Sequence, residues 1–344
     1  MSEPALDGVD VAIVGASGAV GEVMREILEE RNFPLRNMHL LASERSAGTR
    51  LQFRGKSLVL QNLADFDFGQ VQIALFSAGG SISAQFAPKA VATGCIVIDN
   101  TSYFRRDPEI PLVVPEVNAN RISDYGKRGI IANPNCSTIQ MLVALKPIYD
   151  AVGIERINVS TYQAVSGAGK RAIETLASQT AKLLNNQPIV HDVFPQQIAF
   201  NCLPYGWPME DNDYTNEEMK MVWETRKILE DDEIRVNPTC VRVPVFYGHS
   251  EAVHIETKAP LSAAAAAELL AAAPGIQVIN DSEKPDFPTQ VRDAASSDLV
   301  YVGRIRQDLE SDRALNLWIV SDNIRKGAAL NSIQIAEVLL KHLE

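Results

Sequence analysis

The chain has 344 residues, more than one hydrophobic core normally serves, so we expect two domains. Hydrophobic residues make up 46% and charged residues 22%, which is typical of a globular protein. The formal net charge of −11 argues against a nucleic-acid partner, because phosphate backbones require clustered Lys and Arg.

The cysteines and the N-terminal residues indicate in which cellular compartment the protein is expected. Cys95, Cys136, Cys202 and Cys240 are widely spaced, without a C-x-x-C pair or a His cluster, so we interpret them as reduced thiols and expect no metal. Residues 1–7 are acidic and lack the basic and apolar regions of a signal peptide. No apolar run reaches the length of about 18 residues that suggests a membrane span. We therefore expect a cytoplasmic protein that does not bind membranes.

In chain order, the first predicted element is a strand over Val9–Val14, which runs into Gly15–Gly21 and then an amphipathic helix. The glycines follow a G-x-x-G-x-x-G spacing, a variant of the dinucleotide fingerprint in which glycine lets the backbone approach a pyrophosphate at a helix N-terminus. A glycine pattern alone is weak evidence. The strand before it and the helix after it strengthen the prediction of a dinucleotide site.

The second predicted strand, Met38–Ala42, ends in the segment Ser43–Gly48. At this place in dinucleotide folds an acidic residue reads the 2′-hydroxyl of NAD, whereas an arginine accommodates the 2′-phosphate of NADP. Glu44 and Arg45 are both present, and Arg45 with the Ser46 hydroxyl forms a candidate phosphate clamp. This pattern favours NADP, with a solvated loop of mixed charge as the competing interpretation.

Further strands are predicted at Val71–Phe76 and Ile96–Asp99, with a helix at Ile82–Val91 between them. This alternation predicts a doubly wound parallel sheet. Two loops are predicted after it, at 100–106 and 113–118, and ligands bind at such strand ends. Arg105 is a candidate anion ligand in the first loop, and a surface arginine is the competing interpretation.

Cys136 follows a short apolar strand at 129–132, in the stretch Asn133–Thr138. The apolar positions after it have helical spacing, so a helix begins beside the cysteine. The N–H groups and the dipole at a helix N-terminus stabilise a thiolate and can hold an oxyanion. The stretch thus predicts a nucleophile with part of its oxyanion hole, although a buried structural cysteine explains it equally well.

Beyond Cys136 the predicted elements indicate a mixed or antiparallel sheet. They are a strand at Ile157–Val165, a flexible turn at Ser166–Lys170, a helix around Glu217–Val222 in which Glu217 and Lys220 share a face, strands at Cys240–Phe246 and Gly248–Glu256, a strand at Leu315–Val320, a loop with Asn323, and a helix at 328–340.

The ordered motifs resemble the aspartate-β-semialdehyde dehydrogenase family in its bacterial form, from the glycine loop to the final helix. They are Gly15–Gly21, Ser77–Gly79, Asn100–Ser102, Val114–Asn118, Asn133–Thr138, Gln163–Gly167, Glu217–Val222, Arg242–Glu251 and Ser321–Asn323. No catalytic position departs from the family pattern.

The resemblance implies a Rossmann-type dinucleotide-binding domain and an α+β catalytic and dimerisation domain with a mixed sheet. The first would comprise residues 1–133, with the C-terminal helix of 322–344 returning to it, and the second 134–321. The implied reaction is the reversible, NADP-dependent reductive dephosphorylation of L-aspartyl 4-phosphate to L-aspartate 4-semialdehyde through a cysteine thioester. It serves the biosynthesis of lysine, threonine, methionine and diaminopimelate, and the enzyme would be a homodimer.

The resemblance also implies roles for individual residues. Cys136 would be the nucleophile, His249 the acid/base with an ordinary pKa near 6.5, and Gln163 the residue that orients the intermediate. Arg242 and Glu217 would bind the substrate carboxylate and amino group, and Arg105 and Lys220 the inorganic phosphate. The implied cofactor-binding residues are Ser17, Gly18, Ala19, Val20, Arg45, Ser46, Ser166, Gly167 and Asn323.

Two alternatives accompany this interpretation. N-acetyl-γ-glutamyl-phosphate reductase uses the same thioester chemistry, but typically has glycine immediately before the cysteine, where this chain has Asn135. A non-catalytic paralogue acting as a binding protein is the second alternative. Intact Cys136, Gln163, Arg242 and His249 argue against it.

Overall fold

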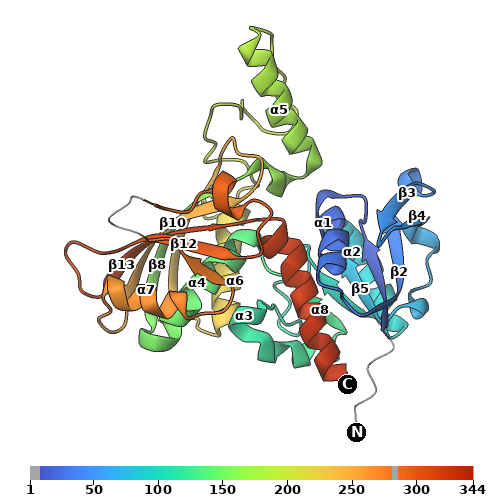
Figure 1. Ribbon diagram of the computed structural model, residues 1–344, viewed down its shortest axis with the longest axis horizontal. Helices are drawn as coiled ribbons and strands as arrows, with labels where there is room; N and C mark the ends of the chain where they lie inside the picture. Colours follow the sequence, from blue (N-terminus) through green and yellow to red (C-terminus); the bar gives the residue numbers. More distant parts are fainter. Residues whose placement is uncertain (1–7, 281–285, 344) are drawn as a thin grey trace. The chain divides into compact units, whose positions relative to one another are not determined.

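The computed structural model describes residues 8–280 and 286–343 (Figure 1). The chain forms two compact units, one of residues 1–134 and 328–344 and the other of residues 135–327. The sequence analysis placed these boundaries after residues 133 and 321. The predicted fold class is confirmed, because one unit has a mainly parallel sheet of Rossmann type and the other has a mixed sheet.

Over its described residues, the first unit contains a seven-stranded sheet. In spatial order the strands are β3 (Arg50–Phe53), β4 (Lys56–Asn62), β2 (Leu35–Ala42), β1 (Val9–Val14), β5 (Ile73–Phe76), β6 (Ile96–Asp99) and β7 (Ile130–Ala132). All neighbours are parallel except β3 and β4, which pair antiparallel. The chain order reverses between β1 and β5, so their carboxyl ends, at Val14 and Phe76, lie side by side.

The first unit's helices are α1 (Ala19–Glu30), α2 (Gly80–Ala92), α3 (Pro115–Asn118) and α8 (Leu330–Leu343). The predicted loop at 113–118 is wrong in part, because Pro115 occupies the first turn of α3, where its missing N–H costs nothing. α8 lies beside α1 (Figure 1). Its Asn331 Nδ2 donates to Val113 O at 3.0 Å and Asn133 Oδ1 at 2.7 Å, which connects the start of α8 to the segment before Cys136.

The second unit contains a six-stranded mixed sheet over the residues described. Its spatial order is β11 (Ile276–Val278), β12 (Val300–Gln307), β13 (Ala314–Ser321), β10 (His249–Thr257), β8 (Ile154–Gln163) and β9 (Arg235–Arg242). The helices of this unit are α4 (Cys136–Val152), α5 (Lys170–Leu184), α6 (Asn216–Leu229) and α7 (Ala263–Ala271). α4 packs on the sheet between α6 and α7, whereas α5 extends away from it (Figure 1).

Side-chain alternation divides the sheet of the second unit into two faces. His249, Glu251, Val253 and Ile255 of β10 are buried on the face under α4, while the residues between them point to the open face. The apolar rows of the sheet and the nearly all-buried first half of α4 form this core. The catalytic candidates on the strands therefore belong to the helix-covered face.

Short helical turns complete the two units. They are 3₁₀ turns at Glu44–Ser46, Leu63–Asp65, Phe68–Gln70, Ala119–Lys127 and Val165–Ala168, and π-type turns at Gln290–Ala294 and Arg325–Ala329. Within residues 8–280 and 286–343, no helix has both the length and the apolar content needed to cross a membrane.

Two predictions about elements of the second unit are wrong. The strand predicted at Cys240–Phe246 ends at Arg242, because the chain leaves the sheet through the Pro244 loop. The flexible turn predicted at Ser166–Lys170 is a 3₁₀ turn that leads into α5, whose apolar face packs with Phe194, Ile198 and Leu203. β3, β4, β11, β12, α5 and α7 were not predicted as elements.

Candidate active site

Cys136 is the first residue of α4, as predicted. Asn135 caps the helix, and its Oδ1 accepts hydrogen bonds from the backbone N–H groups of Ser137 at 3.0 Å and Thr138 at 3.4 Å. These two N–H groups are therefore already paired. Asparagine is a strong N-cap residue, and here it takes up two of the N–H groups at the helix start. The expectation of part of an oxyanion hole beside Cys136 stays a prediction.

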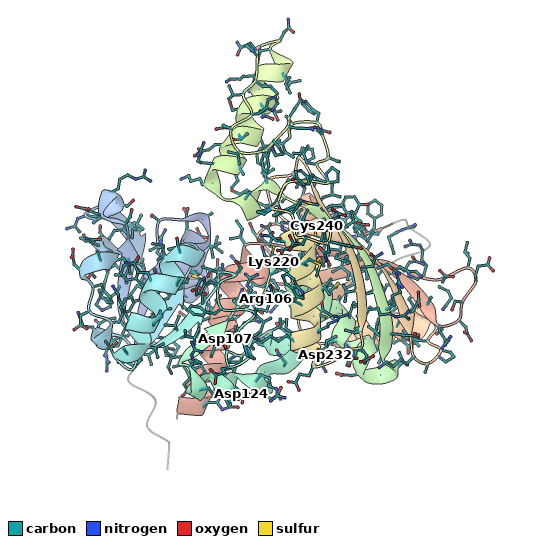
Figure 2. The ribbon with its side chains drawn as sticks, turned by 180° about the vertical axis from the view of Figure 1, so that it is seen from behind. Arg106, Asp107, Asp124, Lys220, Asp232 and Cys240 are labelled. Carbon is teal, nitrogen blue, oxygen red and sulfur yellow. The ribbon has the colours of Figure 1, made fainter. Side chains whose placement is uncertain are left out.

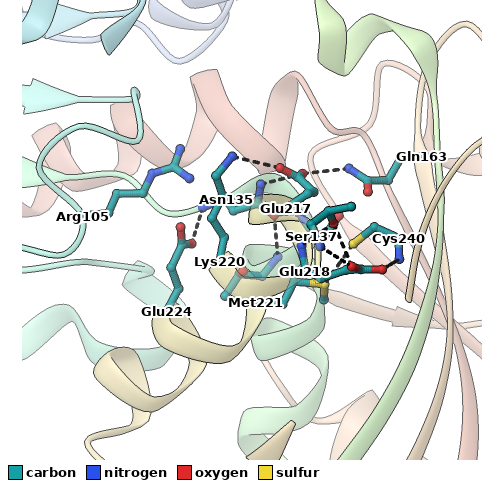
Figure 3. Close-up of polar contacts among 12 residues, drawn as sticks. Arg105, Asn135, Ser137, Gln163, Glu217, Glu218, Lys220, Met221, Glu224 and Cys240 are labelled. Carbon is teal, nitrogen blue, oxygen red and sulfur yellow. Dashed lines mark hydrogen bonds and ion pairs between the residues drawn. The ribbon is translucent and has the colours of Figure 1, made fainter. Parts of the chain in front are cut away.

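The carboxylate of Glu217, on the first turn of α6, is where the candidate side chains meet (Figure 3). Its Oε1 accepts from Asn135 Nδ2 at 2.9 Å and from Gln163 Nε2 at 3.0 Å, and its Oε2 accepts from Lys220 Nζ at 3.0 Å. Burial works to raise the pKa of Glu217, but Lys220 and the two amides outweigh it and hold the pKa at about 2. Glu217 is thus a buried, ionised acceptor.

The start of α6 is specified by a capping box. Glu218 N–H donates to Thr215 Oγ1 at 3.3 Å, and Thr215 N–H donates to Glu218 Oε2 at 2.7 Å. The other oxygen, Glu218 Oε1, accepts the backbone N–H of Cys240 on β9 at 3.0 Å. Figure 2 shows Lys220 and Cys240 near one end of α6 and Asp232 beyond the other. A hydrogen bond to β9 therefore fixes the helix start that bears Glu217 and Lys220 on the sheet.

Sheet register brings three candidates into one row. Gln163 of β8 pairs with Arg242 of β9, and the pairing of Ser250 with Tyr162 places His249 of β10 on the other side of Gln163. We call His249, Gln163 and Arg242 the catalytic row. All three are at most 4% exposed. Strand pairing alone thus brings Gln163 next to Arg242 and His249, which are far from it in the sequence.

The backbone of Ala164 links two members of the catalytic row. Arg242 Nη1 donates to Ala164 O at 2.7 Å, and Ala164 N–H donates to His249 Nδ1 at 3.0 Å. The Arg242 guanidinium also lies over the ring of Trp207, 4.6 Å from its centroid. Burial lowers the pKa of Arg242, while Glu217 and Cys136 lie close enough to oppose that shift. Arg242 therefore has its plane and position set by the protein.

His249 differs from the expectation of an ordinary pKa. Burial, followed by the neighbouring Arg242 charge, lowers its pKa to about 3, so the imidazole is neutral near pH 7. Since Nδ1 accepts a backbone N–H, the proton of the neutral ring resides on Nε2. Among the described residues Nε2 has no hydrogen-bond partner although it is buried. A buried, unpaired N–H is thus available to a ligand.

Three predicted cofactor residues lie next to the catalytic row. The Ser166 hydroxyl and the Asn323 side chain are hydrogen-bonded, with Asn323 Nδ2 3.0 Å from Ser166 Oγ, and Asn323 Oδ1 accepts the Gly248 N–H at 2.9 Å. A Cβ on Gly167 would lie 3.0 Å from Arg242 Nη1 and 3.4 Å from His249 Nε2. Glycine at 167 therefore lets the chain pass close to both side chains.

In the first unit, the glycine loop has the geometry that the fingerprint predicts. Gly15 has φ of +91°, and a Cβ on Gly21 would lie 2.3 Å from Gly15 O, so α1 packs against the turn that follows β1. Ser17, Gly18, Ala19 and Val20 then form the N-terminus of α1 at the point where the strand order reverses. These residues fit a pyrophosphate, because a helix N-terminus favours an anion.

The remaining candidates of the first unit lie on loops after strands. Arg45 and Ser46 occupy the turn after β2, and Arg45 is exposed. Arg105 follows β6 and donates through Nη2 to Asn100 O at 3.0 Å. Lys220, its predicted partner at the phosphate, belongs to the other unit. Their convergence stays a prediction.

The sequence did not predict some of the residues at the site. Glu224 accepts the Asn135 backbone N–H at 2.6 Å. Its position two helical turns after Glu217 was a signal that could have identified it. A Cβ on Gly327 would lie 2.6 Å from Cys136 Cβ, and this close approach has no sequence signal, because it arises from a long-range packing contact. Trp207 under Arg242 lies in a loop and likewise has no local signal.

Two family models match the chain in succession: the semialdehyde dehydrogenase NAD binding domain over residues 10–125 and the semialdehyde dehydrogenase dimerisation domain over residues 145–326. The aspartate-semialdehyde dehydrogenase of Legionella pneumophila is 62% identical over 331 residues, covering 96% of this chain and 95% of that protein.

Solved structures agree with these matches. The crystal structure of aspartate semialdehyde dehydrogenase II from Vibrio cholerae, complexed with ASA, has a TM-score of 0.95 and 60% identity over 97% of this chain and 98% of that chain. The enzyme from Candida albicans with NADP has a TM-score of 0.76 and 27% identity over 96% and 98%. With both domains matched in order and the high identity extending over nearly the full length, the chain belongs to the aspartate-semialdehyde dehydrogenase family.

Proposed function

We propose that this protein catalyses the reversible, NADP-dependent reductive dephosphorylation of L-aspartyl 4-phosphate to L-aspartate 4-semialdehyde through a thioester on Cys136. The observation that carries the proposal is the arrangement within the second unit. Cys136 begins α4 directly after Asn135, whose side chain shares the Glu217 carboxylate with Gln163 and Lys220. This arrangement combines a nucleophile with a cation and with groups that orient a substrate.

The residues of the first unit fit a dinucleotide. The close approach at Gly21 and the positive φ at Gly15 shape the turn before α1, so Ser17, Gly18, Ala19 and Val20 would hold the pyrophosphate. Arg45 and Ser46 would hold a 2′-phosphate, which supports NADP over NAD. Ser166, Gly167 and Asn323 would contact the nicotinamide part. The bound cofactor supplies the hydride in reduction and accepts it in the reverse reaction.

Cys136 would form and cleave the covalent bond. The Cys136 thiolate attacks the acyl phosphate carbon, a C–S bond forms, and the C–O bond to phosphate breaks. In the reverse direction inorganic phosphate attacks the thioester carbon and the thiolate leaves. The N-terminal end of α4 stabilises the thiolate in both directions through the helix dipole.

Arg242, Glu217 and Gln163 would position the substrate, and Lys220 and Arg105 the phosphate. Arg242 keeps N–H groups for a substrate carboxylate beyond the one given to Ala164 O, since its Nε is buried without a partner among the described residues. Glu217 is ionised and suits an amino group.

His249 would act once the substrate is bound. In the structure its imidazole is neutral, first because of burial and second because of the Arg242 charge. A carboxylate bound to Arg242 would offset the second cause and so work to raise the pKa of His249. The Nε2 atom, which is unpaired in the described part of the chain, would face the substrate oxygen.

A homodimer is the expected assembly. The open face of the second unit's sheet carries a groove of about 620 Å³ lined by residues such as Ala252, Phe287 and Trp318. The matched family model for this unit is a dimerisation domain, which supports a second copy as its occupant. Measuring the mass by sedimentation would test this assembly. We also propose a cytoplasmic location and a role in the biosynthesis of lysine, threonine, methionine and diaminopimelate.

The decisive experiment is phosphate-dependent reduction of NADP⁺ with L-aspartate semialdehyde. Cys136→Ala is expected to lower the rate by several orders of magnitude, because it removes the covalent nucleophile, while NADP⁺ affinity changes little. Cys202→Ala, at an exposed free cysteine, is the matched control and should retain the parent rate. A folded Cys136→Ala protein with substantial turnover would refute the thioester mechanism, and a wild-type protein without this activity would refute the proposed function.

A further inference from the structure

We propose that Thr161 is a positioning residue for Gln163, which it holds in the one amide orientation that the reaction requires. This inference rests on the proposed function. Thr161 lies on β8, two residues before Gln163, and neither side chain of the pair is more than 1% exposed. Because residues two apart on a strand share a face, Thr161 lies directly behind the catalytic row on the helix-covered face.

Thr161 belongs to a second row that runs parallel to the catalytic row. On one side it pairs with Glu251 of β10, and on the other with Cys240 of β9. We call Glu251, Thr161 and Cys240 the second row. All three are fully buried. Of these side chains, Thr161 has a hydrogen bond to the catalytic row: its Oγ1 is 3.0 Å from Gln163 Oε1.

The hydrogen bonds around Gln163 can run in only one direction. Glu217 is ionised, so its Oε1 can only accept, and Gln163 must present Nε2 to it at 3.0 Å. The amide oxygen then points back to Thr161, which must donate its hydroxyl proton. If the amide rotated by a half-turn, its oxygen would face the Glu217 carboxylate and its NH₂ group would face the Thr161 hydroxyl. Because a hydroxyl can also accept, the carboxylate of Glu217 selects the orientation, and Thr161 supplies the donor that holds the amide oxygen in it.

Removal of the hydroxyl affects more than one side chain. Without it, Gln163 Oε1 becomes a buried acceptor with no partner, and the amide is held at one end alone. Glu217 Oε1, which also accepts Asn135 Nδ2 beside Cys136, shares any displacement of Gln163. Misplacement of a positioning group by about 1 Å can reduce a rate by about 100-fold. Thr161 thus acts on the reaction through Gln163 without touching substrate.

The test compares Thr161→Val with Thr161→Ser in the phosphate-dependent oxidation of aspartate semialdehyde. Valine keeps the β-branched shape and removes the hydroxyl, so kcat is expected to fall by about 10-fold to 100-fold. The KM for NADP⁺ should stay at the parent value. Serine restores the donor and should recover most of kcat, which a purely structural role of the methyl group does not predict.

Thr257→Val is the matched control. Thr257 is a buried threonine on the adjacent strand β10, and its hydroxyl donates to the backbone carbonyls of Ala259 or Arg313 at the far end of the sheet. Loss of the Thr257 hydroxyl should lower the midpoint temperature of thermal unfolding and leave kcat unchanged. If Thr161→Val also lowers the midpoint, comparison with this control separates lost stability from lost positioning.

A double-mutant cycle completes the test. In a Gln163→Ala background, Thr161→Val should have little further effect on kcat, because its target is gone. Three outcomes would each overturn the inference while leaving the proposed function intact. They are an equal reduction of kcat in both backgrounds, a serine variant that does not restore kcat, and an unchanged kcat in Thr161→Val. A wild-type protein without the activity would refute both the inference and the proposed function. Should the valine variant not fold, the serine variant and the cycle with Thr161→Ala decide the question.

Discussion

Glu251 is the buried acidic residue of the second row for which the proposed chemistry has no use. It is fully buried, and among the described residues neither carboxyl oxygen has a hydrogen-bond partner. Burial raises its pKa well above the usual range, and the nearby Gln140 amide opposes this only in part. The Glu251 carboxyl therefore keeps its proton to a higher pH in the folded protein than in the unfolded chain.

This difference predicts a pH-dependent stability. The folded-state pKa of Glu251 is above its unfolded value, so the folded state retains a proton that the unfolded state releases. The free energy of unfolding therefore falls as pH rises from about 4.5 through the folded pKa, by at most about 1.4 kcal/mol per pH unit. Glu251→Gln cannot titrate, so it should match the parent near pH 4.5 and be increasingly more stable above it.

Urea unfolding of both proteins between pH 5 and 8 checks this prediction. Glu256→Gln, on the same strand but with its side chain on the opposite face, controls for removal of a carboxylate from β10. A difference between Glu251→Gln and parent that does not grow with pH would contradict a raised pKa of Glu251 in the folded protein.

At the scale of elements, the start of α6 positions two of the candidate site residues, Glu217 and Lys220. The Thr215–Glu218 capping box fixes the first turn, and Glu217 and Lys220 project from it. Thr215→Ala should cost about 1 kcal/mol of stability through the lost cap and should also raise the KM for phosphate, because a frayed first turn no longer holds Lys220.

Thermal unfolding and phosphate-dependent kinetics on the same samples measure both effects. Thr215→Ser keeps the capping hydroxyl and should behave like the parent. If Thr215→Ala loses stability but its phosphate KM stays at the parent value, Lys220 is positioned by something other than the helix start, or does not bind phosphate.

At the scale of the whole molecule, the predicted phosphate ligands Arg105 and Lys220 belong to different units, and their convergence on one phosphate is a prediction. Arg105 is buried, and Lys220 forms an ion pair with the buried Glu217 at 3.0 Å. A dianionic phosphate is held best by more than one cation. We expect Arg105→Ala and Lys220→Ala each to raise the KM for phosphate with little change in NADP⁺ binding, and the double mutant to depart from additivity, as neighbouring sites do.

Arg106→Ala, at the exposed arginine next to Arg105, is the matched control for lost positive charge. Strict additivity, together with a normal phosphate KM in either single mutant, would mean that the two cations do not share a site.

Local patterns predicted much of this protein. The glycine spacing after an apolar strand predicted the turn before α1, and the apolar positions after Cys136 predicted α4. Both rest on backbone sterics and helical periodicity, which act over a few residues. The strand β12 and the helix α5 were missed although their partners lie near them in the sequence. β12 pairs with the next strand, β13, and the buried positions of α5, among them Ala172, Leu176 and Gln179, have helical spacing.

The sequence by itself determined the family, the fold class and the residue types of the site, because ordered motifs and local periodicity are written along the chain. Only the tertiary structure decided the states of those residues. Strand pairing puts Arg242 beside Gln163 and buries His249, which makes the imidazole neutral. The Asn135 side chain occupies the N–H groups of Ser137 and Thr138 at the start of α4. Burial, charge proximity and hydrogen-bond direction depend on residues tens of positions apart, which no local pattern contains.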